Sequence, residues 1–289
     1  MVTNTGERRL DVTPSPQLTA ITAERFSGKA WRRYNGYAFA AKENLIALVA
    51  AELANAVPAM PVGFVQTGEG FQLVAVTGLE PAVNLFVAPD GRWLSSYVPA
   101  TLRGYPFRLV KVEGREESLL CIDEASGLVV ETGLGEPFFD ETGQPAQALK
   151  QVLEFLSQVE RSRMATEAAV DALAAAGLIQ PWPLNLKRGE QQVAVTGLYR
   201  IDEAALHALD DKAFLGLRAS GALPVAYAQL MSINQLTVLE RLAQLQAKLQ
   251  AQASRVVQKL ANLEGIGLSQ DDGTLKFDSS LTVAKKVYQ

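Results

Sequence analysis

The sequence contains a single cysteine, Cys121, and a single histidine, His207, among its 289 residues. One cysteine cannot form an intramolecular disulfide or a multi-cysteine zinc site, so the chain fits a reducing, cytoplasmic compartment. The two counts together argue against a Ser-His-Asp triad, a multi-histidine metal centre and an HExxH zinc motif. The sequence therefore predicts no cofactor and no metal site, and any remaining metal chemistry would need carboxylates.

Long apolar runs and an excess of positive charge are also missing. No run of about 18 apolar residues occurs, which predicts the absence of a membrane span. The charged start has no apolar core behind it, so it does not resemble a secretory signal. Lys and Arg total 27 against 31 Asp and Glu, a net charge of −4. This balance provides no general attraction for nucleic acid, and we expect no nucleic-acid partner.

Hydrophobic side chains make up 48% of the chain, enough for the core of one large domain or two ordinary ones. Residues 1–20 instead mix Thr, Pro, Ser and charge without apolar periodicity, which favours a mobile arm. We therefore expect a folded body over residues 21–235, with order beginning near Trp31.

A helix and a β-hairpin are predicted at the start of this body. Apolar residues recur at helical spacing after Glu43, and Pro58 and Pro61 would end the helix. Residues 62–66 and 71–76 then flank a glycine-rich turn and predict the hairpin. The helical positions are Leu45, Leu48, Val49 and Leu53.

The same order returns later in the chain. A helix over 166–176 precedes two short strands, 184–187 and 192–195, and the hexapeptide Val74 to Leu79 recurs identically as Val193 to Leu198. Duplication of a unit over about 44–107 and 164–227 explains the match, and convergence of two segments is the alternative. The predicted fold is α+β, with two diverged copies of a helix–β-hairpin–helix unit sharing one core.

Three further segments are predicted outside the copies. Residues 107–112 and 118–123 favour a second hairpin, and residues 144–159 an amphipathic helix. Residues 236–264 predict a long heptad helix that can form a coiled coil and drive homo-oligomerisation, and residues 265–289 a polar tail. The predicted oligomerisation residues are Val238, Leu242, Leu245, Leu249, Val256 and Leu263.

Six segments in this order resemble the SapC family, which is named for its association with bacterial surface-layer protein genes. They span about 21 to 235, and the heptad helix after about 240 departs from the usual family pattern. The segments are Tyr37-Ala-Phe-Ala-Ala, Gly78-Leu-Glu-Pro with Asn84 to Leu94, Tyr105-Pro-Phe, Leu120 to Leu128, Gly135 to Asp140, and Gly197 to Leu206 continuing to Ala226-Tyr-Ala-Gln-Leu.

The resemblance implies a connection with the surface layer or the envelope. It implies no reaction and carries over no catalytic residue, since the family has no established biochemistry. Members are also often encoded near halogenases, cupin-like oxygenases and TonB-dependent receptors, which implies an accessory role in peptide or amino-acid modification as an alternative.

A short segment of the first copy combines aromatic rings with guanidinium groups. This mixture suits a carboxylate, a peptide or a partner loop, whereas a turn, a core tryptophan and a helix cap are the structural alternative. The second copy has Phe214 at the position of Trp93, so the cluster belongs to the first copy. The candidate binding residues are Asp90, Arg92, Trp93, Tyr97, Arg103 and Tyr105.

Other reactive side chains favour structural roles. A Cys121 nucleophile would need His207 as its base, and a buried structural thiol is the commoner case. Arg32 and Arg33, between Trp31 and Tyr34, only superficially resemble a nucleic-acid patch. The following acidic group could supply oxygen ligands, but its spacing does not match a calcium loop and solvated acidic turns are the better explanation: Asp123, Glu124, Glu131, Glu136, Asp140 and Glu141.

Two functions remain open at this point. The first is a non-enzymatic interaction or assembly protein, linked to surface-layer or envelope proteins, that binds a protein or peptide partner. The alternative is an accessory subunit or an unrecognised enzyme in peptide or amino-acid modification.

Overall fold

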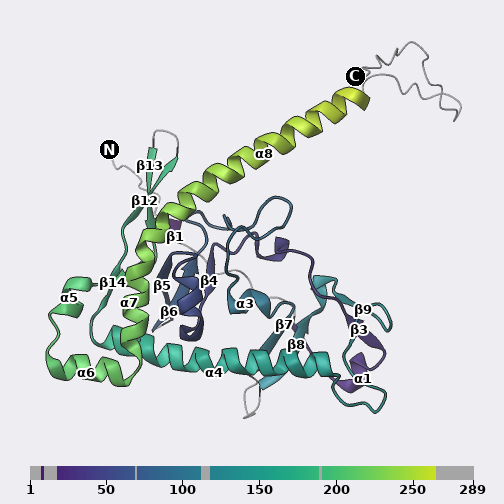
Figure 1. The fold of residues 1–289 in the computed structure, drawn as a ribbon, viewed down its shortest axis with the longest axis horizontal. Helices are drawn as coiled ribbons and strands as arrows, with labels where there is room; N and C mark the ends of the chain where they lie inside the picture. Colours follow the sequence, from purple (N-terminus) through teal and green to yellow (C-terminus); the bar gives the residue numbers. More distant parts are fainter. Residues whose placement is uncertain (1–7, 10–17, 69, 112–117, 189–190, 265–289) are drawn as a thin grey trace, which may run out of the picture. The chain divides into compact units, whose positions relative to one another are not determined.

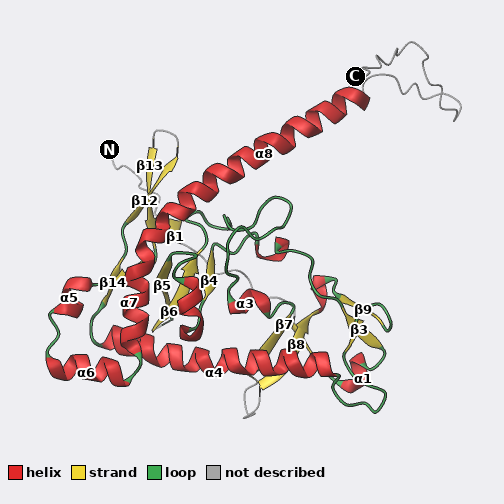
Figure 2. Cartoon of the chain, in the orientation of Figure 1, coloured by secondary structure: helices red, strands yellow, loops and turns green. Residues whose placement is uncertain are grey.

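The computed structural model describes residues 8–9, 18–68, 70–111, 118–188 and 191–264 (Figure 1). Helices and strands mix along the chain, which confirms the α+β class (Figure 2). The chain divides into two compact units, residues 1–247 and residues 248–289. All the sheets belong to the first unit, and the described residues of the second unit, 248–264, are helical.

The strands are β1 (Arg8–Arg9), β2 (Leu18–Ala20), β3 (Lys29–Trp31), β4 (Leu45–Ala47), β5 (Val62–Thr67), β6 (Gly70–Val76), β7 (Phe107–Lys111), β8 (Ser118–Asp123), β9 (Val129–Glu131), β10 (Glu136–Pro137), β11 (Ile179–Pro181), β12 (Leu184–Arg188), β13 (Gln191–Thr196) and β14 (Leu198–Ile201). The α-helices are α1 (Ala23–Phe26), α2 (Leu53–Ala56), α3 (Ala100–Arg103), α4 (Gln147–Ala175), α5 (Glu203–His207), α6 (Asp211–Ala219), α7 (Ala222–Ser232) and α8 (Leu236–Glu264). Short 3-10 helices are η1 (Ala38–Ala40), η2 (Ala50–Glu52), η3 (Glu124–Ser126) and η4 (Ile233–Gln235).

A five-stranded antiparallel sheet of order β11-β14-β5-β6-β4 forms the centre of the first unit. Its strands β5 and β6 are the predicted hairpin, joined by a tight turn between Thr67 and Gly70. Alternating β-branched and aromatic residues explain why this segment is extended. Helices α4 and α7 pack against this sheet, and together they bury the larger of two apolar cores.

The second core lies beside the three-stranded sheet β2-β8-β7, which contains the second predicted hairpin. Its centre includes Phe26, Trp31, Phe107 and Phe138, and the edge of Trp31 meets Phe107 with ring centroids 4.8 Å apart. Helix α4 contributes to both cores, with Leu149 and Leu156 to the second and its last turns to the first. The helix therefore connects the two parts of the first unit (Figure 1).

Two other three-stranded sheets complete the described strands, with orders β10-β3-β9 and β1-β13-β12. Strand β3 ends at Trp31, so the β10-β3-β9 sheet carries this residue into the second core. No helix in the described ranges is both long and apolar enough to cross a membrane.

One local prediction was wrong. The predicted helix after Glu43 is instead strand β4, the 3-10 turn η2 and the single turn α2, because Leu45–Ala47 pair with β6. Two parts of the predicted arm pair with the body, Leu18–Ala20 with β8 and Arg8–Arg9 with β13. Described strands and a helix thus occur before Trp31. The rest of the predicted arm and the polar tail over 265–289 lie outside the described residues.

The two identical hexapeptides have different neighbours. In the first, Val74–Val76 belong to β6 of the five-stranded sheet, whereas in the second Val193–Thr196 belong to β13 of another sheet. Leu198 then begins β14, which pairs with β5, so both repeats contribute to the five-stranded sheet. The common origin of the two segments stays a prediction.

Helix α8 is present over the predicted range, and its first turns pack on the body of the first unit. Leu239 and Leu242 are 3% and 7% exposed, and Val238 packs against the same core. The Gln246 side-chain amide donates to three backbone carbonyls after β6, the shortest bond being 2.8 Å to Val87. Leu242 was predicted to contribute to an oligomer interface. Its burial in the core of its own chain leaves it little surface for contact with a second chain.

Candidate functional site

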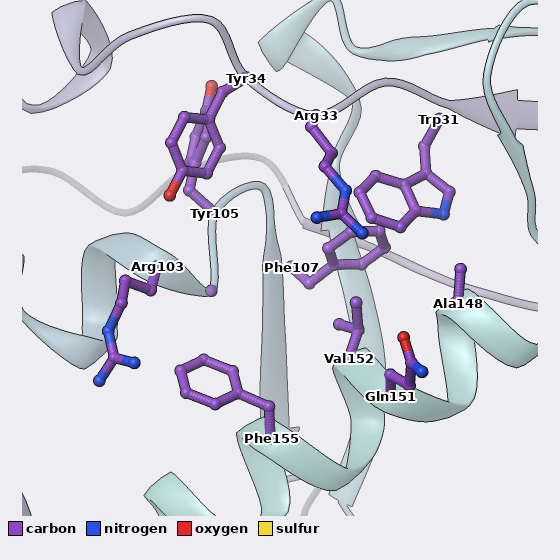
Figure 3. Close-up of a pocket in the computed structure, with 11 residues that line it drawn as sticks. Trp31, Arg33, Tyr34, Arg103, Tyr105, Phe107, Ala148, Gln151, Val152 and Phe155 are labelled. Carbon is purple, nitrogen blue, oxygen red and sulfur yellow. The ribbon is translucent and has the colours of Figure 1, made fainter. Parts of the chain in front are cut away.

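A pocket of about 410 Å³ lies where three distant segments of the first unit meet. We call it the Arg–aromatic pocket. Helix α4 forms one wall, the turn between α3 and β7 a second, and the residues at and after the end of β3 a third (Figure 3). The lining residues are Trp31, Arg33, Tyr34, Arg103, Gly104, Tyr105, Phe107, Ala148, Gln151, Val152 and Phe155.

The walls of the pocket are mostly aromatic and apolar, and they are anchored in the fold. Trp31 and Phe107 belong to the second core and hold each other edge to face. Tyr105 stacks on Phe39, with centroids 3.8 Å apart and planes 8° from parallel. Tyr34 meets both of these rings edge-on. Such interlocked rings form a preformed surface, so little ordering is required when a ligand binds.

The charge of the pocket is positive. Arg33 and Arg103 both line it, and none of its lining residues that the structure describes is Asp or Glu. Both arginines and Gln151 are exposed, so the pocket is open to solvent. Within the described ranges neither guanidinium forms an ion pair, which leaves two cations available to an anionic group.

Arg103 is held in place by a hydrogen-bonded network behind the pocket. Its Nη2 donates to the hydroxyl oxygen of Tyr97 over 3.3 Å, and its guanidinium lies 5.7 Å from the Tyr97 ring centroid and 5.2 Å from that of Phe155. The Tyr97 hydroxyl in turn donates to Glu52 Oε2 over 2.7 Å. The position of Arg103 therefore depends on a carboxylate that does not line the pocket.

Glu52 is the buried centre of this network, with only 4% of its surface exposed. Its carboxylate accepts three hydrogen bonds, from the backbone N–H of Val49 and of Ala100 and from Tyr97. These bonds compensate the carboxylate for its loss of hydration and connect η2 to the start of α3.

The tyrosines near the pocket remain neutral at physiological pH. Burial and a hydrogen bond with Tyr37 raise the pKa of Tyr34 to about 12. Burial and the hydrogen bond to Glu52 raise the pKa of Tyr97 to about 12. Burial, together with the negative charge of Asp123, also raises the pKa of Tyr105. The hydroxyls thus stay protonated, and the pocket's charge comes from the two arginines.

One buried polar atom at the pocket has no partner. Trp31 is 5% exposed, and its indole Nε1 finds no hydrogen-bond acceptor among the residues that the structure describes. In the view of Figure 3 this nitrogen lies on the side of the ring toward Ala148 and Gln151 of α4. A buried donor without an acceptor is costly, and this one is closed off from solvent in the pocket as well.

The six residues of the predicted binding cluster separate into three groups. Arg103 and Tyr105 line the pocket. Trp93 and Tyr97 lie in the layer behind it, where the Trp93 indole donates to the Tyr97 carbonyl over 2.6 Å and packs on Phe86 and Tyr37. Asp90 and Arg92 pair with each other on an exposed turn over 2.7 Å and do not line the pocket. This bond lowers the pKa of Asp90.

Sequence reasoning missed most of the pocket. Arg33 and Tyr34 were considered only as part of a nucleic-acid patch, and Gln151 and Phe155 only as part of an amphipathic helix. One signal was available, because two arginines between Trp31 and Tyr34 are themselves an aromatic–guanidinium mixture. Glu52 could have been noticed as a lone acid within an apolar run.

The other candidate residues have structural surroundings. Cys121 is buried in β8, and burial raises the pKa of its thiol, which opposes formation of the nucleophilic thiolate. Glu124 forms an ion pair with Arg25, and Asp140 accepts hydrogen bonds from Thr142 and Gln144 in a turn. Within the described part of the chain, no three His, Cys, Asp or Glu side chains gather as metal ligands.

The predicted oligomerisation residues differ in how far they are buried. Leu242 is a core residue, and Val238 is partly buried against the same core. Leu245 is 40% exposed, and Leu249 is partly exposed. The side chains of Val256 and Leu263 lie outside those that the structure describes.

Comparison with known proteins identifies the family. The SapC family model matches residues 21–239, most of the chain, so this protein belongs to the SapC family. The matched region contains every residue that lines the Arg–aromatic pocket. No curated protein matches the sequence, and no solved structure matches it.

Proposed function

We propose that this SapC-family protein is a non-enzymatic binding protein that takes part of a protein or peptide partner into the Arg–aromatic pocket. The observation that carries the proposal is the pocket itself, in which two arginines that form no ion pair with the described residues border a rigid aromatic surface. Aromatic and arginine side chains dominate the energetics of protein interfaces. A connection with surface-layer or envelope proteins is part of the proposal and rests on the family name alone, and a cytoplasmic location rests on cysteine usage.

The alternative is an accessory subunit or an unrecognised enzyme in peptide or amino-acid modification. The volume of about 410 Å³ favours it, since this is the size of a small-molecule site as well as of a side-chain pocket. The lining residues that the structure describes supply no carboxylate, imidazole or thiol to act as a base or nucleophile. We therefore prefer the binding function to the accessory or enzymatic one.

A negative charge introduced on helix α4 tests the binding role. Gln151→Glu introduces a negative charge at the exposed edge of the pocket and should weaken an anionic partner about tenfold or more through the lost attraction to the arginines. Gln158→Glu is the matched control, because it makes the same change at an exposed position of the same helix outside the pocket lining.

The experiment compares immobilised wild-type protein with both variants, and quantitative mass spectrometry identifies the retained proteins. We expect specific partners on the wild type and on Gln158→Glu that are lost from Gln151→Glu. The same set of proteins on all three would contradict a binding role for the pocket.

Self-association through the second unit is a separate proposal. Leu249, Val256 and Leu263 continue the heptad spacing through residues 248–264, which are helical. Replacing Leu249 and Val256 by Asp should convert any dimer or higher oligomer to a monomer in light scattering, since a charge at such a position is unfavourable in a coiled-coil seam. A wild-type chain that is already a monomer at micromolar concentration would contradict this proposal.

Duplication of the helix–hairpin–helix unit is likewise a proposal about origin. It is supported by the identical hexapeptides and by the strands that both segments contribute to the five-stranded sheet. The different surroundings of β6 and β13 count against a strict structural repeat.

A further inference from the structure

We infer that the Arg–aromatic pocket recognises the C-terminal carboxylate of a peptide chain whose last side chain is aromatic or large and apolar. This inference rests on the proposed binding function and names the chemistry of its ligand. Two features of the pocket lead to it: the two arginines and the apolar walls between them.

The arginines select an anion. A guanidinium binds a carboxylate through two parallel N–H donors, and the absence of acidic residues from the described lining leaves this charge uncompensated. Arg33 is the better candidate for direct contact. Arg103 is held by Tyr97 and lies near the rings of Tyr97 and Phe155, so it contributes a fixed positive charge at one side of the pocket.

The apolar walls favour a ligand that has an apolar group close to its anionic group. Phe107, Val152 and Phe155 line the same space as the arginines, and in Figure 3 the Arg33 side chain extends toward Phe107. A simple inorganic anion would leave these walls in contact with water. The last residue of a peptide satisfies both requirements, because its carboxylate and its side chain are attached to the same carbon atom.

Trp31 contributes its ring to the wall of the pocket. Its Nε1 atom has no acceptor among the described residues, but it is also buried from solvent, so a ligand in the pocket does not reach it in this conformation. A ligand that is both anionic and apolar therefore fits the pocket.

Isothermal titration of the full chain with synthetic tripeptides tests the inference. The probes are N-acetyl-Ala-Ala-Phe with a free carboxylate, the same peptide as its C-terminal amide, and corresponding peptides ending in Leu and Trp. We expect the free acids to bind about tenfold or more tighter than the amides, because only the acids offer a charge to the arginines. Equal binding of acid and amide would overturn carboxylate recognition.

Two neighbouring arginines provide matched variants. Arg33→Gln should abolish the preference for the acid, whereas Arg32→Gln, which removes the same charge one residue away and outside the pocket lining, should retain it. Arg32 donates to the Leu134 carbonyl instead, so its thermal unfolding is measured in parallel. An acid preference that survives Arg33→Gln would contradict the role given to this residue.

The remaining outcomes separate this inference from the proposed function. If acid and amide bind equally and Gln151→Glu weakens both, the pocket binds peptides and only the carboxylate inference fails. If N-acetylphenylalanine binds as tightly as the tripeptide, the ligand is an amino acid and the chain-end inference fails. If no peptide binds at about 1 mM, the inference is wrong, while partner retention tests the proposed function separately.

Discussion

Replacing Glu52 by Ala should lower the free energy of unfolding by about 3–5 kcal/mol. The substitution removes a buried acceptor from three donors, the Val49 and Ala100 amides and the Tyr97 hydroxyl. A buried donor left without an acceptor costs about 1–3 kcal/mol, and little room exists for water at a side chain that is 4% exposed. Urea denaturation followed by circular dichroism measures the loss.

Two milder variants separate the contributions of the individual hydrogen bonds to the free energy of unfolding. Glu52→Gln retains one acceptor oxygen and should lose about 1–3 kcal/mol, and Tyr97→Phe removes the hydrogen bond to Glu52 and should lose about 1–2 kcal/mol. Tyr97→Phe also releases Arg103 from its hydroxyl partner, so peptide affinity should fall with it. A loss below about 1 kcal/mol for Glu52→Ala would show that the carboxylate does not organise this region.

Replacing Leu242 by Ala should lower the free energy of unfolding by about 2–4 kcal/mol, because this leucine is buried in the larger core. Leu245→Ala is the matched control on the same helix. Leu245 is 40% exposed, so its truncation should cost about 1 kcal/mol or less.

Comparison of Leu242→Ala with Leu245→Ala shows whether the start of α8 packs on the body of its own chain. A large difference between the two variants, observed at a protein concentration where the chain is monomeric, places Leu242 in the chain's own core. Equal small losses would contradict the packing of α8 on the body and would return Leu242 to a surface role.

The sequence predicted the elements whose signal is local. The hairpin β5–β6 was recognisable because β-branched and aromatic residues flank a glycine-rich connection, and the hairpin β7–β8 because a charged stretch of sequence separates two apolar segments. The long α8 was recognisable from its heptads. The segment after Glu43 was wrongly predicted as a helix, because apolar residues three and four apart also occur where a short strand is followed by a 3-10 turn. Pairing with β6 selects the strand over the helix, and this pairing is not visible in the local sequence.

The candidate site was only partly predictable because its residues are distant in sequence. Arg103 and Tyr105 carried a local aromatic–guanidinium signal, but Trp31 and Phe155 reach the same pocket from β3 and α4. Only the second core brings these segments together, and it depends on contacts among residues over 100 positions apart, such as those of Phe26 and Phe138. The buried role of Glu52 likewise depends on donors almost 50 positions away.

The indole N–H signals of the three tryptophans provide the most direct test of the pocket as a carboxylate site. In a ¹⁵N-labelled chain, addition of N-acetyl-Ala-Ala-Phe acid should shift the Trp31 indole signal strongly, because the peptide binds against the Trp31 ring that lines the pocket. Trp182 lies in the other core and should not move, and Trp31→Phe assigns the signal. An unmoved Trp31 signal at saturating peptide, or equal shifts with the amide, would contradict the account.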